Sequence, residues 1–172
     1  MIQTIIRSAI PGDAAQLAGL AESTFRATFG AANTEANLSL HCESSYGAEI
    51  QLAEITDPQM HTFVAEDNNS LAAYAQVRRS KPPQCVKGQF PIEIQRLYVN
   101  SSYHGRGLAQ ALMAECLAYA RSLRSEVVWL GVWEHNPRAV AFYRKCRFVE
   151  VGEHIFRLGD DPQRDIIMAI HV

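Results

Sequence analysis

A glycine-bearing turn holds the residues whose types and spacing suggest chemistry most clearly. Residues 97–109 read LYVNSSYHGRGLA, an apolar strand pattern that runs through Gly105 and Gly107 into a helical pattern. The glycines let backbone N–H groups converge at the positive end of the following helix dipole, which suits an anion such as a phosphate. A tight turn that merely needs flexible residues is the alternative. The common nucleotide motifs are not matched, because no Gly-Lys-Ser/Thr follows and no third glycine comes three residues on.

Cysteine and histidine, the other reactive residue types, form no pattern. Cys42, Cys85, Cys116 and Cys146 lie about thirty or more residues apart and make no Cys-x-x-Cys pair. We therefore expect free thiols and a reducing, cytoplasmic location. The six histidines show no ligand spacing, so we expect no metal.

The elements that must position the turn can be predicted from hydrophobic periodicity. Strands are expected at residues 5–10, 61–66, 71–77, 92–99, 127–132, 148–156 and 166–170. Helices are expected after Asp13, between about 35 and 53, from about 107 to 123, and from Pro137 onward. Three local signals support these bounds: a capping box of Asp13 and Gln16, a hairpin turn at 67–70, and Asn136 as an N-cap. Residues 80–88, with two prolines and a glycine, are expected to form an exposed loop.

This order of elements predicts the fold class. It favours a mixed, mainly antiparallel α+β sheet flanked by helices, with one parallel strand pair around the helix that follows Val99. A chain of 172 residues without internal repeats or linkers is expected to form a single domain, residues 1–172.

Composition excludes several classes of protein. The net charge is −2, with no long basic run, which argues against a nucleic-acid binder. The longest apolar stretch, the seven residues 127–133, is far shorter than the ~20 residues of a membrane span. The first residues, MIQT, show neither a basic nor a sustained apolar region, so we expect no secretory signal.

Two segments resemble the motifs of the GNAT superfamily of acetyl-coenzyme A (acetyl-CoA) dependent N-acetyltransferases. The Arg/Gln-x-x-Gly-x-Gly/Ala signature is matched by residues 104–109, HGRGLA, although His104 stands where the family usually has arginine or glutamine. The Asn-x-x-Ala-x-x-Phe-Tyr motif is matched by residues 136–143, NPRAVAFY, although Arg147 stands where the family usually has a glycine. The resemblance covers essentially the whole chain. It implies a GNAT-like sheet whose parallel strand pair splays apart at the CoA site, and acetyl-CoA as cosubstrate.

Three further segments are similar to the PaiA-type spermidine/spermine N-acetyltransferases: residues 24–29 (TFRATF), 129–136 (WLGVWEHN) and the tail from Gly159 to Ala169. This similarity implies transfer to a primary amine, with a polyamine as the acceptor, by direct attack on the thioester. Other amines, such as an amino acid, an aminoglycoside or a protein amine, are the alternative acceptors. A CoA-binding regulatory protein with little turnover is the alternative class. A homodimer is compatible with the resemblance, since dimers are common in the family.

The resemblance also implies which residues hold the cosubstrate. The backbone of Leu97, Tyr98 and Val99 would pair with the pantetheine arm and stabilise the oxyanion, and Asn136 would bind the same arm. The pyrophosphate would rest on N–H groups of the turn, at His104, Gly105, Arg106, Gly107, Leu108 and Ala109. One member of a basic cluster would meet the 3′-phosphate; its members are Arg138, Arg144, Lys145 and Arg147.

Catalysis of amine acetylation needs a base and an acid. A primary amine has a pKa of roughly 10.4, so exposing its free form at pH 7 costs ~4.6 kcal/mol. By resemblance Glu93 is the candidate base, with a structural ion pair, for example to Arg96, as the alternative. Tyr143 matches the acid that protonates the leaving thiolate, with a core tyrosine as the alternative. A subgroup that acetylates protein N-termini carries a glutamate at the position of Gly131, which is absent here.

The acceptor side is less well marked in the sequence. A polycation needs carboxylates near it, and the candidates are Glu22, Glu35, Glu43 and Glu134, each equally readable as a surface acid. Phe29 and Trp133 would either line the methylene spacers or pack in the core.

Overall fold

The chain folds into the strands of a central sheet and the helices that flank it. The computed structural model describes residues 4–172. Its strands are β1 (Ile5–Ser8), β2 (Met60–Asp67), β3 (Ser70–Arg78), β4 (Ile92–Val99), β5 (Val127–Trp133), β6 (Val149–Leu158) and β7 (Asp161–His171). Its α-helices are α1 (Ala14–Phe29), α2 (Glu35–Ser45), α3 (Ala48–Thr56), α4 (Leu108–Ser122) and α5 (Pro137–Lys145). Short 3₁₀ turns occupy Pro11–Asp13, Gly30–Ala32 and Ser101–Tyr103.

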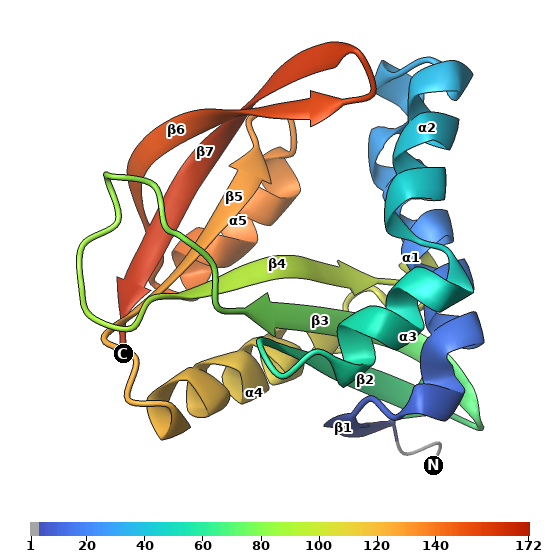
Figure 1. Cartoon of the computed structure of the whole chain (residues 1–172), viewed down its shortest axis with the longest axis horizontal. Coiled ribbons are helices and arrows are strands. Elements are labelled where there is room, and N and C mark those ends of the chain that lie inside the picture. Colours follow the sequence, from blue (N-terminus) through green and yellow to red (C-terminus); the bar gives the residue numbers. More distant parts are fainter. Residues whose placement is uncertain (1–3) are drawn as a thin grey trace.

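The strands form one sheet in the order β1-β2-β3-β4-β5-β7-β6. Neighbouring strands are antiparallel except β4 and β5, which are parallel. Figure 1 shows β4 and β5 starting side by side and then diverging, with α1 and α2 at the open side. The predicted mixed, mainly antiparallel α+β sheet is therefore confirmed.

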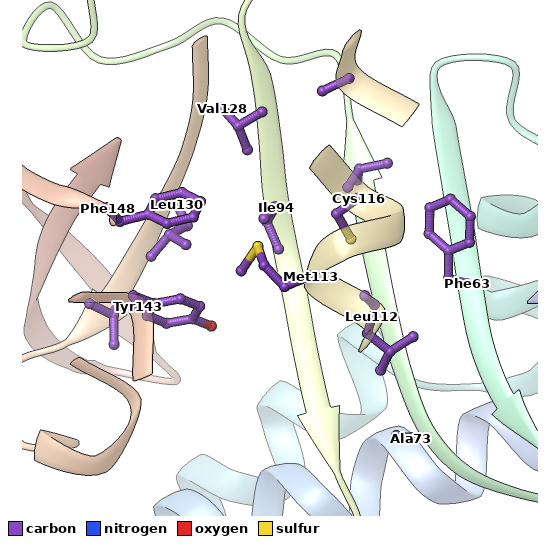
Figure 2. Close-up of a cluster of buried hydrophobic side chains, with 14 of the residues drawn as sticks. Phe63, Ala73, Ile94, Leu112, Met113, Cys116, Val128, Leu130, Tyr143 and Phe148 are labelled. Carbon is purple, nitrogen blue, oxygen red and sulfur yellow. The ribbon is translucent and has the colours of Figure 1, made fainter. Parts of the chain in front are cut away.

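Both faces of the sheet are buried, because successive side chains of β2 and β3 point to opposite sides. Phe63 and Ala73 pack toward α4, in the cluster that contains Leu112 and Met113 (Figure 2). Val64 and Tyr74 pack on the other face, with Leu17 and Phe25 of α1. These two layers fix the position of β4 between α4 and the α1–α3 group.

Most predicted elements are present, with local differences in their bounds. The predicted helix over 35–53 is two helices, α2 and α3, since Tyr46 ends the first and Gly47 caps the second with an extended backbone. The first strand ends at Ser8 and not at residue 10. The predicted hairpin is confirmed, with Asn68 and Asn69 at φ +50° and +62°.

The predicted capping box of Asp13 and Gln16 is wrong. The Asp13 carboxylate turns away from α1 and accepts hydrogen bonds from Arg7 and from the N–H of Ile10. The Gln16 amide bonds to the backbone of Asn69 and Leu71 instead. A nearby guanidinium outcompetes the helix N–H groups, because charge-assisted hydrogen bonds are the stronger ones.

Candidate active site

The separation of β4 from β5 opens the centre of the sheet. The two strands are paired only at Ile92↔Val128 and Glu93↔Trp129. Beyond that point β5 pairs with β7 alone, while β4 continues along β3 to Val99. The edge of β4 that faces β5 is therefore without a strand partner from about residue 94 onward.

Backbone groups of Leu97 and Val99 point into this opening. The N–H of Asn100 donates to the carbonyl of Ala72 on β3 at 2.9 Å, so it faces β3. Because successive residues of a strand direct their backbone groups to opposite sides, those of Val99 and Leu97 face β5. The Val99 carbonyl agrees, since it accepts a hydrogen bond from His104 Nε2 at 2.9 Å. Tyr98 differs from the expectation, because by the same alternation its N–H faces β3.

The glycine-bearing turn follows directly and presents further free donors. Asn100 begins it by accepting hydrogen bonds from the N–H and hydroxyl of Ser102. Gly105 and Gly107 adopt φ of +78° and +80°, a region that side-chain-bearing residues rarely occupy. The N–H groups of His104 and Arg106 are already donated within the turn, to Ser101 and Tyr103. The free donors are therefore at Gly105, Gly107 and the first residues of α4, Leu108 and Ala109.

The side chain of His104 connects this turn to α5. Its Nδ1 lies 2.9 Å from Arg138 Nη1, and its Nε2 lies 2.9 Å from the Val99 carbonyl. Arginine can only donate and a carbonyl can only accept, so the ring carries its hydrogen on Nε2. Arg138 is thus the member of the basic cluster that lies beside the turn, whereas Arg144 pairs with Glu150.

The second predicted motif, residues 136–143, forms the start and most of α5. Asn136 caps the helix, its Oδ1 accepting from the N–H of Ala139 at 3.2 Å. Arg147 adopts φ +69°, so the turn expected to need a glycine is formed by an arginine in the left-handed region. Tyr143 is 9% exposed, and Figure 2 shows its hydroxyl directed toward β4. Burial raises the pKa of Tyr143, which keeps the phenol protonated at neutral pH.

A cavity of about 300 Å³ lies where β4 and β5 diverge. Five of the predicted site residues line it: Glu93, Leu97, Tyr98, Asn136 and Tyr143. Val99 and the turn at 104–109 lie outside this lining. On the side away from α5 the lining is aromatic, with Phe25, Phe29, His41, Tyr46, Trp133 and Phe156. The cavity therefore joins the predicted cosubstrate residues to a second compartment beside α1 and α2.

Glu93 is held by an ion pair, as the alternative for this residue anticipated. Its partner is Arg78 at 2.6 Å and not Arg96, and the Ser80 hydroxyl also donates to it at 2.6 Å. Arg96 pairs instead with Glu54 at 2.7 Å. The Glu93 carboxylate thus faces the cavity with both oxygens already hydrogen-bonded to the protein.

The predicted acceptor-side acids do not line the cavity. Glu22 and Glu35 pair with Arg26, Glu134 pairs with Arg164, and Glu43 is exposed on α2. Phe29 and Trp133 do line it, with their rings 5.1 Å apart.

Two residues that were not predicted also line the cavity, the carboxylate Asp165 and its neighbour His154. They are cross-strand partners on β7 and β6, with Asp165 Oδ2 at 3.9 Å from His154 Nε2. Asp165 is 8% exposed, and its Oδ1 has no hydrogen-bond partner among the described residues. The sequence pattern contains one indication of this site. By the two-residue repeat of a strand, Asp165 shares a face with Ile167 and Ala169, which are buried, and a carboxylate on a buried face is costly unless it has a partner or a function.

Burial raises the pKa of the Asp165 carboxyl to about 6 from an ordinary value of 3.8. The folded chain therefore holds this proton between about pH 4 and 6 while the unfolded chain has lost it, so stability falls as the pH rises through 6. Asparagine cannot ionise, so Asp165→Asn avoids the cost of a buried charge at high pH. We expect the free energy of unfolding of the variant minus that of the parent to be roughly 2–3 kcal/mol larger at pH 7.5 than at pH 4. Urea unfolding at the two pH values measures the difference. A difference that does not change with pH would contradict this expectation.

Residues 4–172 contain neither a membrane-spanning helix nor a cluster of metal ligands. No helix there combines the length and apolar composition needed to cross a bilayer. No group of three or more His, Cys, Asp or Glu side chains in that range is arranged to hold a metal ion.

Known proteins share both the sequence and the fold. Residues 22–148 match the model of the acetyltransferase (GNAT) family. An uncharacterised N-acetyltransferase of Mycobacterium tuberculosis (strain H37Rv) is 31% identical over 157 residues, which cover 91% of this chain and 96% of the relative. One of Lactobacillus delbrueckii subsp. lactis is 28% identical over 156 residues, covering 91% and 90%. The crystal structure of the PaiA N-acetyltransferase of Thermoplasma acidophilum in complex with coenzyme A superposes with a TM-score of 0.78 at 18% identity, covering 99% of this chain and 100% of that one.

Proposed function

The chain belongs to the GNAT family and is an acetyl-CoA dependent N-acetyltransferase, and on this premise we propose that its acceptor is a primary amine, with a polyamine as the first acceptor to test. The observation that carries the proposal is the divergence of β4 and β5 into a cavity that reaches from Tyr143 to an aromatic compartment. We further propose that residues 1–172 act as one transferase domain.

The free backbone donors of β4 fit the pantetheine arm of CoA, which contains amide groups. In this proposal the N–H groups of Leu97 and Val99 bind the pantetheine arm and the thioester oxygen, since both face the opening without a strand partner. Asn136, at the wall of the cavity, binds the same arm. Tyr98 contributes its side chain to the cavity wall, because its backbone faces β3.

The pyrophosphate is assigned to the glycine-bearing turn. Gly105, Gly107, Leu108 and Ala109 supply unused N–H groups at the start of the fifteen-residue helix α4, where the dipole favours negative charge. The positive charges nearby are Arg106, which lies over the Tyr103 ring, and Arg138, which is bonded to His104. Arg138 is the residue of the basic cluster that we assign to a CoA phosphate.

Tyr143 is assigned as the acid that protonates the leaving thiolate. Its phenol lines the cavity and is held in its protonated form by burial. Removal of the proton from the acceptor ammonium requires a base in the same cavity, where Glu93 and Asp165 are the carboxylates.

The polyamine part of the proposal rests on the sequence similarity to PaiA-type enzymes and on the shape of the cavity. The reacting ammonium would enter the cavity, where the aromatic side chains suit a methylene chain. The remaining charges of an extended polyamine would lie outside, since the acids Glu22, Glu35, Glu43 and Glu134 do not line the cavity.

A thiol-release assay with acetyl-CoA over a panel of amines tests the proposal. The panel contains spermidine, spermine, an amino acid, an aminoglycoside and a peptide with a free N-terminus. We expect turnover of spermidine and spermine with a kcat/KM at least about tenfold above the other amines, a margin that placement of one charged group can provide. Turnover of the peptide with inert polyamines would refute the polyamine acceptor. Binding of CoA in calorimetry without turnover of any amine would favour a regulatory protein instead.

A further inference from the structure

One cavity-lining carboxylate has no cationic partner in hydrogen-bond contact, and that is Asp165. Glu93, the other carboxylate in the lining, is bonded to Arg78 and Ser80. The Asp165 Oδ1 has no hydrogen-bond partner within residues 4–172, and Oδ2 is 3.9 Å from His154 Nε2, beyond hydrogen-bond distance. A buried carboxylate that lacks partners in the protein is costly unless a ligand supplies them.

Gly131 gives Asp165 its access to the cavity. A Cβ atom added at Gly131 would lie 3.1 Å from Asp165 Oδ2 and 3.1 Å from His154 Cε1. The side chains of Asp165 and His154 therefore occupy space next to Gly131 that a side chain at this position would take. Gly131 itself lines the cavity, so at this position β5 places no side chain beside the carboxylate.

We propose that Asp165 binds the ammonium group of the acceptor amine and removes its proton, and that His154 passes this proton to solvent. The proposal rests on the proposed function and extends it by naming the base. It also predicts that the acceptor nitrogen approaches from the β7 side of the cavity.

The charged and titratable groups around Asp165 are compatible with this role. On β4 the phenol of Tyr98 is kept neutral by burial, Glu93 is paired with Arg78, and Arg96, which also lines the cavity, is paired with Glu54. On β6 the neighbour is His154, whose pKa is lowered by burial although Glu93 raises it. At neutral pH the imidazole is therefore a neutral proton acceptor, and its side chain, 38% exposed, reaches solvent.

The step balances in atoms and electrons. One N–H bond of the ammonium breaks, its proton binds a carboxylate oxygen of Asp165, and the nitrogen keeps the electron pair. That pair forms the C–N bond to the acetyl carbonyl carbon, and as the amide forms the nitrogen releases a second proton to solvent. The C–S bond breaks with its electrons on sulfur, and the thiolate takes the proton of the Tyr143 phenol, which is later restored from solvent.

The pH dependence of kcat/KM in Asp165→Asn tests the proposal. With an amine of pKa roughly 10.4, the variant must use the free amine, about one molecule in 2,500 at pH 7. We expect kcat/KM about 10²-fold below the parent at pH 7, rising about tenfold per pH unit and approaching the parent near pH 9. The parent should instead level off above about pH 6–7, once its base is ionised.

Matched controls separate this role from a structural one. Asp160→Asn, in the exposed β6–β7 turn, should keep the parental profile. His154→Gln should lower kcat about tenfold, with recovery on addition of imidazole to the buffer. CoA affinity, measured by calorimetry, should be unchanged in Asp165→Asn, which shows that the cosubstrate site is intact.

Three results would overturn the proposal. The first is a parental kcat/KM in Asp165→Asn at pH 7. The second is a loss of equal size at every pH, which indicates a structural effect. The third is a pH-dependent loss in Glu93→Gln that is absent from Asp165→Asn, which would make Glu93 the base. Absence of turnover in the parent with every amine would instead be a failure of the proposed function, and is therefore distinguishable.

Discussion

Replacing Tyr143 with phenylalanine is expected to lower kcat about 10³-fold while CoA affinity stays within about twofold of the parent. The thiol of the leaving CoA has a pKa near ~8.5, so a phenol beside it is a suitable proton donor, provided that the phenol is protonated. Burial raises the pKa of Tyr143 and so ensures this throughout the neutral range. The variant removes one oxygen atom and keeps the ring that packs against Phe142 and Phe148. Thiol-release kinetics and calorimetry with CoA measure the two quantities.

The matched control is Tyr119→Phe, because Tyr119 lies on α4, stacks on His61 and does not line the cavity. Its kcat should equal that of the parent. A Tyr143→Phe enzyme with nearly parental kcat would show that the tyrosine is only a packing residue. Loss of CoA affinity together with the rate would assign the hydroxyl to binding rather than to proton transfer.

Replacing Arg96 with methionine is expected to lower the free energy of unfolding by about 3 kcal/mol, because it leaves the largely buried carboxylate of Glu54 without its cationic partner. Arg96 Nη1 donates to Glu54 at 2.7 Å and to Gln76 at 2.5 Å, and its guanidinium lies 5.1 Å from the Tyr46 ring centre. The side chains of Arg96 and Glu54 are only 10% and 16% exposed, so solvent cannot replace the lost contacts. Urea unfolding near neutral pH gives the value.

A double variant makes this prediction specific. Arg96→Met combined with Glu54→Met should recover most of the lost stability, since no unpaired charge then remains buried. Arg26→Met is the comparison on the surface, where the acidic partners Glu22 and Glu35 are 47% and 75% exposed, and no measurable change is expected. If Arg96→Met and Arg26→Met lowered the free energy of unfolding equally, burial would not be the cause of the effect at Arg96.

The amino-acid sequence by itself determined the local elements, including the turn to which we assign the cosubstrate. The strand over Ile92–Val99, the helix that begins near Leu108 and the Asn136 cap depend on periodicity and turn residues within a few positions, and the structure confirms them. The positive φ of Gly105 and Gly107 is a local property of the same kind. The capping box at Asp13 failed because its competitor, Arg7, is brought there by the chain path before α1.

Only the tertiary structure decided which carboxylate in the cavity is free. Glu93 and Asp165 cannot be told apart by residue type, yet Glu93 meets Arg78 from the neighbouring strand, whereas Asp165 meets only His154 among the charged groups of residues 4–172. That difference depends on the register of β6 against β7 and on the empty side-chain position at Gly131 on β5. Pairing and desolvation of a charge are set by groups far away in the chain, and these are fixed only when the strands are assembled.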